Sequence, residues 1–308
     1  MEFIWIPIAI AGALMQAVRT AAQKDLNQKL SIMVTTYVRS LFGLPVLLLF
    51  LLWVMMRGAE PVPMPEFSGI FLANTLALAL SQLAATWLLI YVFSLRNFTV
   101  GTTLTKTDVM MTAVIGTLFF SESISLYGWI AIVLTLTGVI ILTIARVGVR
   151  GLIGTESGGL AAALNSKSTR IGLASGFFFS LSYLFVRQSS LSLEYGDFLY
   201  RAGWTVVVAT SMQVMILGAW LLWREPRGLL QMFPQWRLCL FIGLTSALGS
   251  IAWYTSMTLV NASYVKAVGQ IETVFTIAIA TIYFREKVSP MELVGIATIV
   301  GGVLVFLL

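Results

Sequence analysis

The chain of 308 residues contains no histidine and only one cysteine, Cys239. Zinc hydrolases, haem ligation through imidazole and nucleophiles activated by a neighbouring histidine are therefore excluded by composition. A single cysteine forms neither an internal disulfide nor a thiolate metal site. We expect a protein without a metal ion, a cofactor or a catalytic residue of these kinds.

Charge is also scarce: 10% of the residues are charged and 58% are hydrophobic, with a mean hydropathy of +0.93. Soluble globular domains have about 25% charged residues, so this composition indicates an integral membrane protein. The formal net charge is +6, but the basic residues lie singly between apolar runs. Their scatter argues against a nucleic-acid partner and favours a role as topology signals.

Apolar runs of about 20 residues predict transmembrane helices, and this chain has ten of them. They cover residues 3–22, 33–56, 67–95, 98–120, 124–145, 169–190, 200–223, 235–260, 261–283 and 288–308. We therefore predict an all-α polytopic membrane protein. The first run has Glu2 and no basic residue ahead of it, so we expect a retained span and not a signal peptide. The polar, Gly- and Ser-rich residues 146–168 predict a linker that separates five spans from five.

The two halves repeat each other at a fixed offset of 164 residues. This offset pairs Asn97 with Asn261, Asp108 with Glu272, Phe120 with Phe284, Glu122 with Glu286 and Gly138 with Gly302. Because each half has an odd number of spans, the second half enters the membrane in the opposite sense. Residues 1–145 and 169–308 thus predict two inverted five-helix repeats, an architecture by which transporters expose one central site alternately to two sides.

Each half closes with an aromatic pair, a glutamate and a glycine-containing apolar helix, FFSES…TGVIIL and YFREKV…GGVLVFL. With Arg39 and Arg201 near the start of spans two and seven, this pattern resembles the EamA family of the drug/metabolite transporter superfamily. The resemblance implies a permease of the plasma membrane, the inner membrane in bacteria. It also implies a cavity between spans one, three, four, six, eight and nine, and a chain that works as a monomer, with a homodimer as the alternative.

Two acidic residues lie deep in predicted spans, Asp108 in span four and Glu272 at the equivalent depth in span nine. An ionisable group at mid-membrane costs about 2.5–3.5 kcal/mol on insertion scales, so it tends to face a cavity or a partner. Small and hydroxyl residues share their helix faces, which predicts a water-filled wall. These are Gly101, Leu104, Thr105 and Thr112 for Asp108, and Val268, Gly269 and Thr276 for Glu272. In the alternative, each acid is neutralised by a basic side chain of a neighbouring helix.

Two lysines accompany these acids. Lys106 precedes Asp108 by two residues, so the two side chains point to different sides of a helix and Lys106 needs another partner or water. Its repeat counterpart is Gln270, which shares a helix face with Lys266. Lys266 lies near the start of span nine, and it either faces the substrate or snorkels to the membrane interface.

Further polar and aromatic residues complete the predicted substrate site. Gln16 and Arg19 in span one, and Tyr183 in span six, belong to polar stripes, with interfacial anchoring as the alternative. Aromatic pairs in spans three and eight either stack on a planar or cationic substrate or serve in a belt or in helix packing. The predicted substrate-binding residues are Gln16, Arg19, Gln82, Trp87, Tyr91, Lys106, Asp108, Tyr183, Trp253, Tyr254, Lys266 and Glu272.

We predict a secondary transporter, and not an enzyme, that moves a small organic metabolite or drug-like solute by alternating access. The mixture of acids, bases and aromatics favours an amino-acid-like zwitterion or an amphipathic cation. The expected partners are this small-molecule substrate, the lipid bilayer and a coupling proton if transport is proton-driven. The alternatives are an intramembrane enzyme that uses Asp108 and Glu272, and a membrane assembly protein that transports nothing.

Two features of the sequence concern packing and orientation. Gly138, Gly301 and Gly302 lie in the last span of each half, where small residues predict close helix packing. Thirteen lysines and arginines, Arg39 among them, fall on the side reached after the odd-numbered spans, and three fall on the other side. Positive-inside bias then places both termini outside the cytoplasm, whereas the family resemblance implies that both lie inside.

Overall fold

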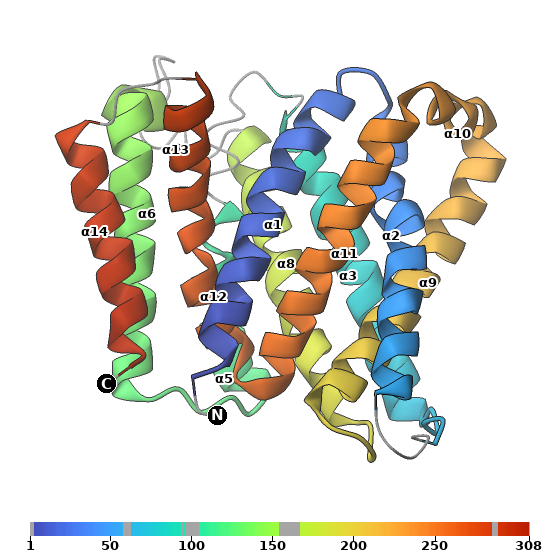
Figure 1. Ribbon diagram of the computed structural model, residues 1–308. Helices are drawn as coiled ribbons and strands as arrows, with labels where there is room; N and C mark the ends of the chain where they lie inside the picture. The colour runs from blue at the N-terminus through green and yellow to red at the C-terminus, as the bar shows by residue number, and fades with distance from the viewer. Residues whose placement is uncertain are drawn as a thin grey trace. The chain divides into compact units, whose positions relative to one another are not determined.

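The computed structural model describes residues 3–57, 63–93, 95, 105–153, 167–284 and 289–307, and all regular structure within these ranges is helical. Figure 1 shows the helices, which are α1 (Trp5–Leu26), α2 (Ile32–Met56), α3 (Gly69–Phe93), α5 (Asp108–Phe119), α6 (Leu126–Ile153), α8 (Lys167–Leu191), α9 (Phe198–Arg224), α10 (Pro226–Gln231), a 3-10 turn (Phe233–Gln235), α11 (Trp236–Leu259), α12 (Ala262–Gly269), α13 (Ile271–Phe284) and α14 (Pro290–Val305). Seven segments in the described ranges are long and apolar enough to cross a membrane, and α5 and α14 are shorter apolar helices. An all-α polytopic fold is confirmed for the described residues, while the count of ten spans stays a prediction.

The chain divides into two compact units, and each unit draws on both halves of the sequence. Unit 1 comprises Met1–Leu83 and Ser182–Asn261, and unit 2 comprises Ala84–Leu181 and Ala262–Leu308. Helices α1, α2, α9 and α11 therefore belong to unit 1, whereas α5, α6, α12, α13 and α14 belong to unit 2. Helices α3 and α8 begin in one unit and end in the other.

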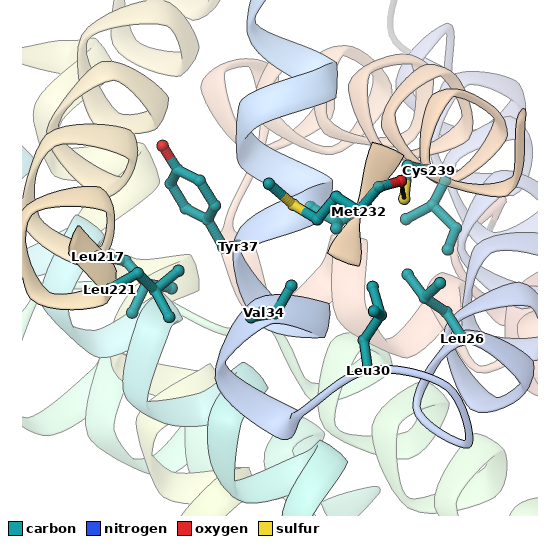
Figure 2. Packing of buried hydrophobic residues seen from close by; sticks show 10 residues of the cluster. Leu26, Leu30, Val34, Tyr37, Leu217, Leu221, Met232 and Cys239 are labelled. Atoms are coloured by element: carbon teal, nitrogen blue, oxygen red, sulfur yellow. Dashed lines mark hydrogen bonds between the residues drawn. The ribbon is translucent and has the colours of Figure 1, made fainter. Parts of the chain in front are cut away.

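Unit 1 is held by helices that are distant in sequence. Helix α1 packs on α11, and α2 packs on both α9 and α11. The turn between α1 and α2 carries Leu26, Leu30 and Val34 into a buried cluster with Leu221 of α9 and Cys239 of α11 (Figure 2). Apolar side chains at the ends of four helices thus close this end of the unit.

In unit 2, α6 and α14 lie side by side along their length (Figure 1). A β-carbon on Gly138 of α6 would lie 2.9 Å from the Gly295 carbonyl oxygen of α14. A β-carbon on Gly302 would lie 3.1 Å from the Ala131 carbonyl oxygen. Only glycine permits so close an approach of the two backbones, so the packing role predicted for Gly138 and Gly302 is confirmed. Gly301 instead faces away, with nothing within 4 Å of a β-carbon.

Local signals explain where α14 begins. The Ser289 hydroxyl accepts a hydrogen bond from the Glu292 backbone N–H at 3.2 Å, and the Glu292 carboxylate accepts one from the Ser289 N–H at 2.7 Å. Pro290 occupies the first turn, where its missing N–H costs nothing. This capping box satisfies two backbone donors that the helix itself leaves unpaired.

The structure corrects several predicted boundaries. Span nine is not one helix, because a turn at Gln270 divides it into α12 and α13. Helix α5 begins at Asp108, so this residue lies at a helix end and not ten residues into a helix. Helix α6 continues to Ile153, so residues 146–153 of the predicted linker are helical. Isolated arginines end an apolar run, but they do not break the backbone hydrogen bonds of a helix.

The structure also changes the argument about the orientation of the chain in the membrane. Arg39, counted among the loop charges, is a buried residue inside α2 with 6% of its surface exposed. It is therefore no topology signal. Several residues used in the sequence argument lie outside the described residues, namely Arg96, Asn97, Gly101, Leu104, Arg285, Glu286 and Lys287.

The contact between α6 and α14 is tested by neighbouring glycines of α14. We expect Gly302→Ala to lower the unfolding temperature in detergent by several degrees, because overpacking of a tight contact costs about 1–3 kcal/mol. Gly301→Ala, the matched control, has open space and should leave the temperature unchanged or slightly raised. Equal unfolding temperatures for the two variants would contradict this packing.

Candidate functional site

The candidate site lies in unit 2, where two helices begin at equivalent positions of the sequence repeat. Lys106 and Thr107 form a turn ahead of α5, and Gln270 forms the turn between α12 and α13. The offset of 164 residues places Lys106 on Gln270 and Asp108 on Glu272. Each repeat therefore has a turn at the same place, followed within two residues by an acidic residue.

The turn at Gln270 replaces helical hydrogen bonds with shorter-range ones. The Gln270 N–H donates to the Ala267 carbonyl at 3.1 Å, and the Thr273 N–H donates to the Gln270 carbonyl at 3.0 Å. The Gln270 side-chain amide donates to the Lys266 carbonyl at 3.4 Å, which occupies an acceptor near the end of α12. Backbone groups at a helix break need such partners in a membrane, where no water replaces them.

Two ion pairs connect the repeats across these breaks. The Lys106 Nζ lies 2.9 Å from Glu272 Oε2, and the Lys266 Nζ lies 3.5 Å from Asp108 Oδ2. Each lysine thus pairs with the acid of the other half, and the four charges sum to zero. This arrangement supports the alternative in which each acid is neutralised by a neighbouring basic residue. It also supplies the partner that Lys106 requires.

Helix ends favour this arrangement of charges. Asp108 and Glu272 lie in the first turns of α5 and α13, and Lys266 lies in the last turn of α12. Partial positive charge at a helix N-terminus stabilises an acid, and partial negative charge at a C-terminus stabilises a lysine. Three of the four charges therefore lie at the helix end that matches their sign.

Equivalent threonines follow both acids. The Thr112 hydroxyl donates to the Asp108 carbonyl at 2.6 Å, and the Thr276 hydroxyl donates to the Glu272 carbonyl at 3.0 Å. Thr112 and Thr276 are related by the same 164-residue offset. Internal symmetry therefore extends from the sequence to side-chain hydrogen bonds.

Burial decides between two of the predicted roles. The Lys266 side chain is 4% exposed and Lys106 is 27% exposed. Snorkelling of Lys266 to the interface is thus wrong, because its ammonium is directed inward to Asp108. Asp108 and Glu272 are buried as well, so among the described residues these two acids are covered and do not face an open, water-filled wall.

A third acid, Glu122, fixes the start of α12. Its carboxylate accepts hydrogen bonds from the Ala262 N–H and the Ser263 hydroxyl, both at 2.8 Å. Glu122 is buried, and the sequence argument used it only as a marker of the repeat. The sequence contained a signal for this role, because an acid that follows α5 can accept hydrogen bonds from the first residues of another helix in the same unit. Among the described residues, no group of three or more metal-ligating side chains lies together.

The aromatic candidates of unit 2 lie near its basic residue Lys167. The rings of Trp87 and Tyr91 stack with centroids 6.0 Å apart, and the Lys167 Nζ donates to the Tyr91 hydroxyl at 2.7 Å. Trp87 is 37% exposed. The same unit also holds the two ion pairs, Lys106 with Glu272 and Lys266 with Asp108.

The remaining predicted site residues, Gln16, Arg19, Gln82, Tyr183, Trp253 and Tyr254, lie in unit 1. Trp253 of α11 packs on α1, because a β-carbon on Gly12 would lie 3.2 Å from its indole ring. Arg187 of α8 donates to the carbonyls of Met257 and Val260 at 3.0 and 2.7 Å and so caps the end of α11. A packing role is thus favoured for Trp253, and a capping role for Arg187.

A buried polar network in unit 1 was missed. The Gln213 side-chain oxygen accepts from Arg39 Nη2 at 3.2 Å and from the Ser40 hydroxyl at 2.9 Å. The Gln213 amide nitrogen donates to the Gln82 side-chain oxygen at 2.7 Å. Gln82 is thereby joined to Arg39, which was interpreted as a topology signal. A glutamine in the middle of predicted span seven was the available sequence signal.

Comparisons with known proteins agree with this architecture. A sequence model described as "EamA-like transporter family" matches residues 3–144 and 170–308. A solved structure described as "Crystal structure of protein" has a TM-score of 0.73 at 12% sequence identity, and the match covers 99% of this chain and 96% of that one. At this identity the likeness shows the fold alone. No curated protein matches the chain.

The two ion pairs should differ in their contribution to stability. We expect Asp108→Asn to lower the unfolding temperature more than Glu272→Gln, because it removes the acidic partner of the more deeply buried lysine, and breaking a buried ion pair costs about 3–5 kcal/mol. The double variant Asp108→Asn/Lys266→Met should recover most of the loss. Asp25→Asn breaks the exposed pair with Lys29 and serves as the control, with little change expected. Equal losses for Asp108→Asn and Asp25→Asn would contradict a stabilising buried pair.

Proposed function

The chain belongs to the EamA-like transporter family, and on this basis we propose that it is a secondary transporter that carries small amino-acid-like zwitterions. Its apolar helices are those of an integral multi-pass membrane protein. The observation that carries the choice of substrate is the neutral set of four charges formed by Lys106, Glu272, Lys266 and Asp108.

A zwitterion can enter this set without leaving a charge unbalanced. Its carboxylate replaces an acid as the partner of one lysine, and its ammonium replaces the lysine as the partner of the released acid. Buried ion pairs are costly to break when one partner is left alone, so a substrate that supplies both partners avoids this cost. Lys106 is the more exposed of the two lysines, and its pair with Glu272 is the expected place of exchange.

An amphipathic cation is the second candidate substrate. It would bring one uncompensated positive charge to a neutral set, and it would need to displace a lysine or release a proton. The stacked rings of Trp87 and Tyr91 favour it, since aromatic faces attract cations. Coupling to a proton would likewise require one acid to break its ion pair with a lysine before it binds the proton. The neutral charge set therefore favours the zwitterion.

The repeat supports alternating access as the mechanism. Both halves carry a turn followed by an acid, and inverted-repeat transporters commonly place their binding sites at such discontinuous helices. We propose ten spans in two inverted repeats, residues 1–145 and 169–308, which act as a monomer or a homodimer in a plasma membrane, the inner membrane in bacteria. Reciprocal pairing between the halves then offers contacts that can be exchanged as the two repeats move.

The alternative functions receive less support. General acid and base catalysis needs two carboxylates with separate protonation roles. Asp108 and Glu272 are instead each engaged by a lysine ammonium. A membrane assembly protein has no need of buried charges at helix breaks. Specific cleavage of helical peptides by the purified protein would favour the enzyme over the transporter.

Substrate class is tested by comparing compounds of similar size that carry both charges, only the carboxylate or only the amine. We expect zwitterions to raise the unfolding temperature of the purified protein, because ligands that bind the native state stabilise it. Uptake of the stabilising zwitterion into proteoliposomes should then saturate. Uptake of the amine alone would support the amphipathic cation in its place.

A charge exchange separates a transport role from a structural one. Lys106→Glu/Glu272→Lys keeps an ion pair but reverses its polarity, so we expect an unfolding temperature within a few degrees of wild type and at least tenfold slower uptake. The control, Asp25→Lys/Lys29→Asp, exchanges the exposed pair and should change neither quantity. Wild-type uptake by the charge-exchanged variant, or by Asp108→Asn/Glu272→Gln, would refute a role for these charges in transport.

A further inference from the structure

Unit 1 contains a small buried pocket whose lining is polar. Its walls come from α2, α3, α9 and α11 and consist of Arg39, Ser40, Gly43, Leu47, Gln82, Thr210, Gln213, Ser246, Ala247 and Ser250. The pocket has about 10 Å³ of space for the centre of a water molecule, close to the minimum for one small occupant. None of these lining residues is acidic.

Arg39 is a buried cation without a carboxylate partner among the described residues. Its guanidinium makes one hydrogen bond, from Nη2 to the neutral side-chain oxygen of Gln213. Its Nε is buried and has no hydrogen-bond partner in the part of the chain that the structure describes. An unpaired charge removed from water is expensive, and buried arginines are normally balanced by an anion.

One neighbouring group adds to this imbalance. The guanidinium of Arg19 acts on Arg39 as a second positive charge, whereas Tyr183 and Tyr254 act on it in the opposite sense. These three residues belong to the set that the sequence predicted for substrate binding. None of the three brings a carboxylate to Arg39.

The lining also keeps hydrogen-bond donors that its two amide oxygens do not use. The Gln213 oxygen already accepts two hydrogen bonds, and the Gln82 oxygen accepts one. Donors remain on Arg39 and on the amide nitrogens of both glutamines, and Thr210, Ser246 and Ser250 contribute hydroxyls to the lining. A water molecule would offer acceptors to some of these donors but would leave the charge of Arg39 uncompensated. An anion satisfies both requirements.

We propose that this pocket is a binding site for one small monovalent anion, held by Arg39 and by the amide and hydroxyl donors of Gln82, Ser246 and Ser250. Space for about one water-sized group favours the smallest monovalent anions, such as chloride or a carboxylate end, over phosphate or a larger anion. Free halide and the carboxylate of a small organic acid share this chemistry. The site lies within unit 1 and is independent of the zwitterion proposal for unit 2.

The test is a titration of the purified full chain with sodium chloride or sodium formate at constant ionic strength, balanced by sodium methanesulfonate, whose anion carries no carboxylate and is larger than either ligand. Unfolding is followed with a thiol-reactive dye, since the single cysteine is buried and becomes accessible only on unfolding. We expect at least one of the two anions to raise the unfolding temperature saturably by a few degrees. Stabilisation by chloride alone identifies free halide as the ligand, and stabilisation by formate alone identifies a carboxylate.

Variants connect the effect to the pocket. Arg39→Gln should abolish the saturable rise, and Arg227→Gln, which removes an exposed arginine of the same unit, should preserve it. If Arg39→Gln does not fold, Ser246→Val decides, because it fills the pocket and leaves the guanidinium in place. The proposal is overturned if neither anion gives a saturable rise in the wild type, or if the rise persists in the variant of Arg39 or Ser246 that folds.

Discussion

A charge that lies in the hydrocarbon of a membrane needs a partner that is fixed in place, and this constraint organises unit 2. Lys106, Asp108, Lys266 and Glu272 would each be costly alone. The helix breaks bring all four together, and the ends of the broken helices add favourable electrostatics to the ion pairs. The breaks therefore support the charges, because they place helix ends of matching polarity next to three of the four charged side chains.

The two units meet the cost of buried charge in different ways. Unit 2 balances two acids with two lysines, so its charge set is neutral as it stands. Unit 1 holds Arg39 next to Gln213, whose side-chain oxygen accepts its hydrogen bond and a second one from Ser40. We propose that the first arrangement suits a ligand that carries both charges, and that the second suits a ligand that carries one negative charge.

Much of this organisation could be predicted from the sequence. Apolar runs gave the membrane class and most helices, and the repeat offset gave the equivalence of Asp108 and Glu272. The break at Gln270 could not be predicted in this way, because hydropathy reports the solvent that a segment prefers and not its backbone path. Pairing of Lys106 with Glu272 was also out of reach, since residues 166 apart meet only through tertiary packing. Arg39 was misassigned because a single arginine near the start of a span has the same signature whether it faces headgroups or the protein interior.

Reciprocal pairing has a consequence for synthesis of the chain. Lys106 leaves the ribosome 166 residues before Glu272. At 5–20 residues per second, this separation corresponds to a wait of about 8–33 s. During that interval the first half contains Lys106 and Asp108, and the second half later brings Lys266 and Glu272, so each half inserts with no net charge from these residues. In the folded chain, each lysine is instead paired with the acid of the other half. Both ion pairs therefore form only after both halves are present.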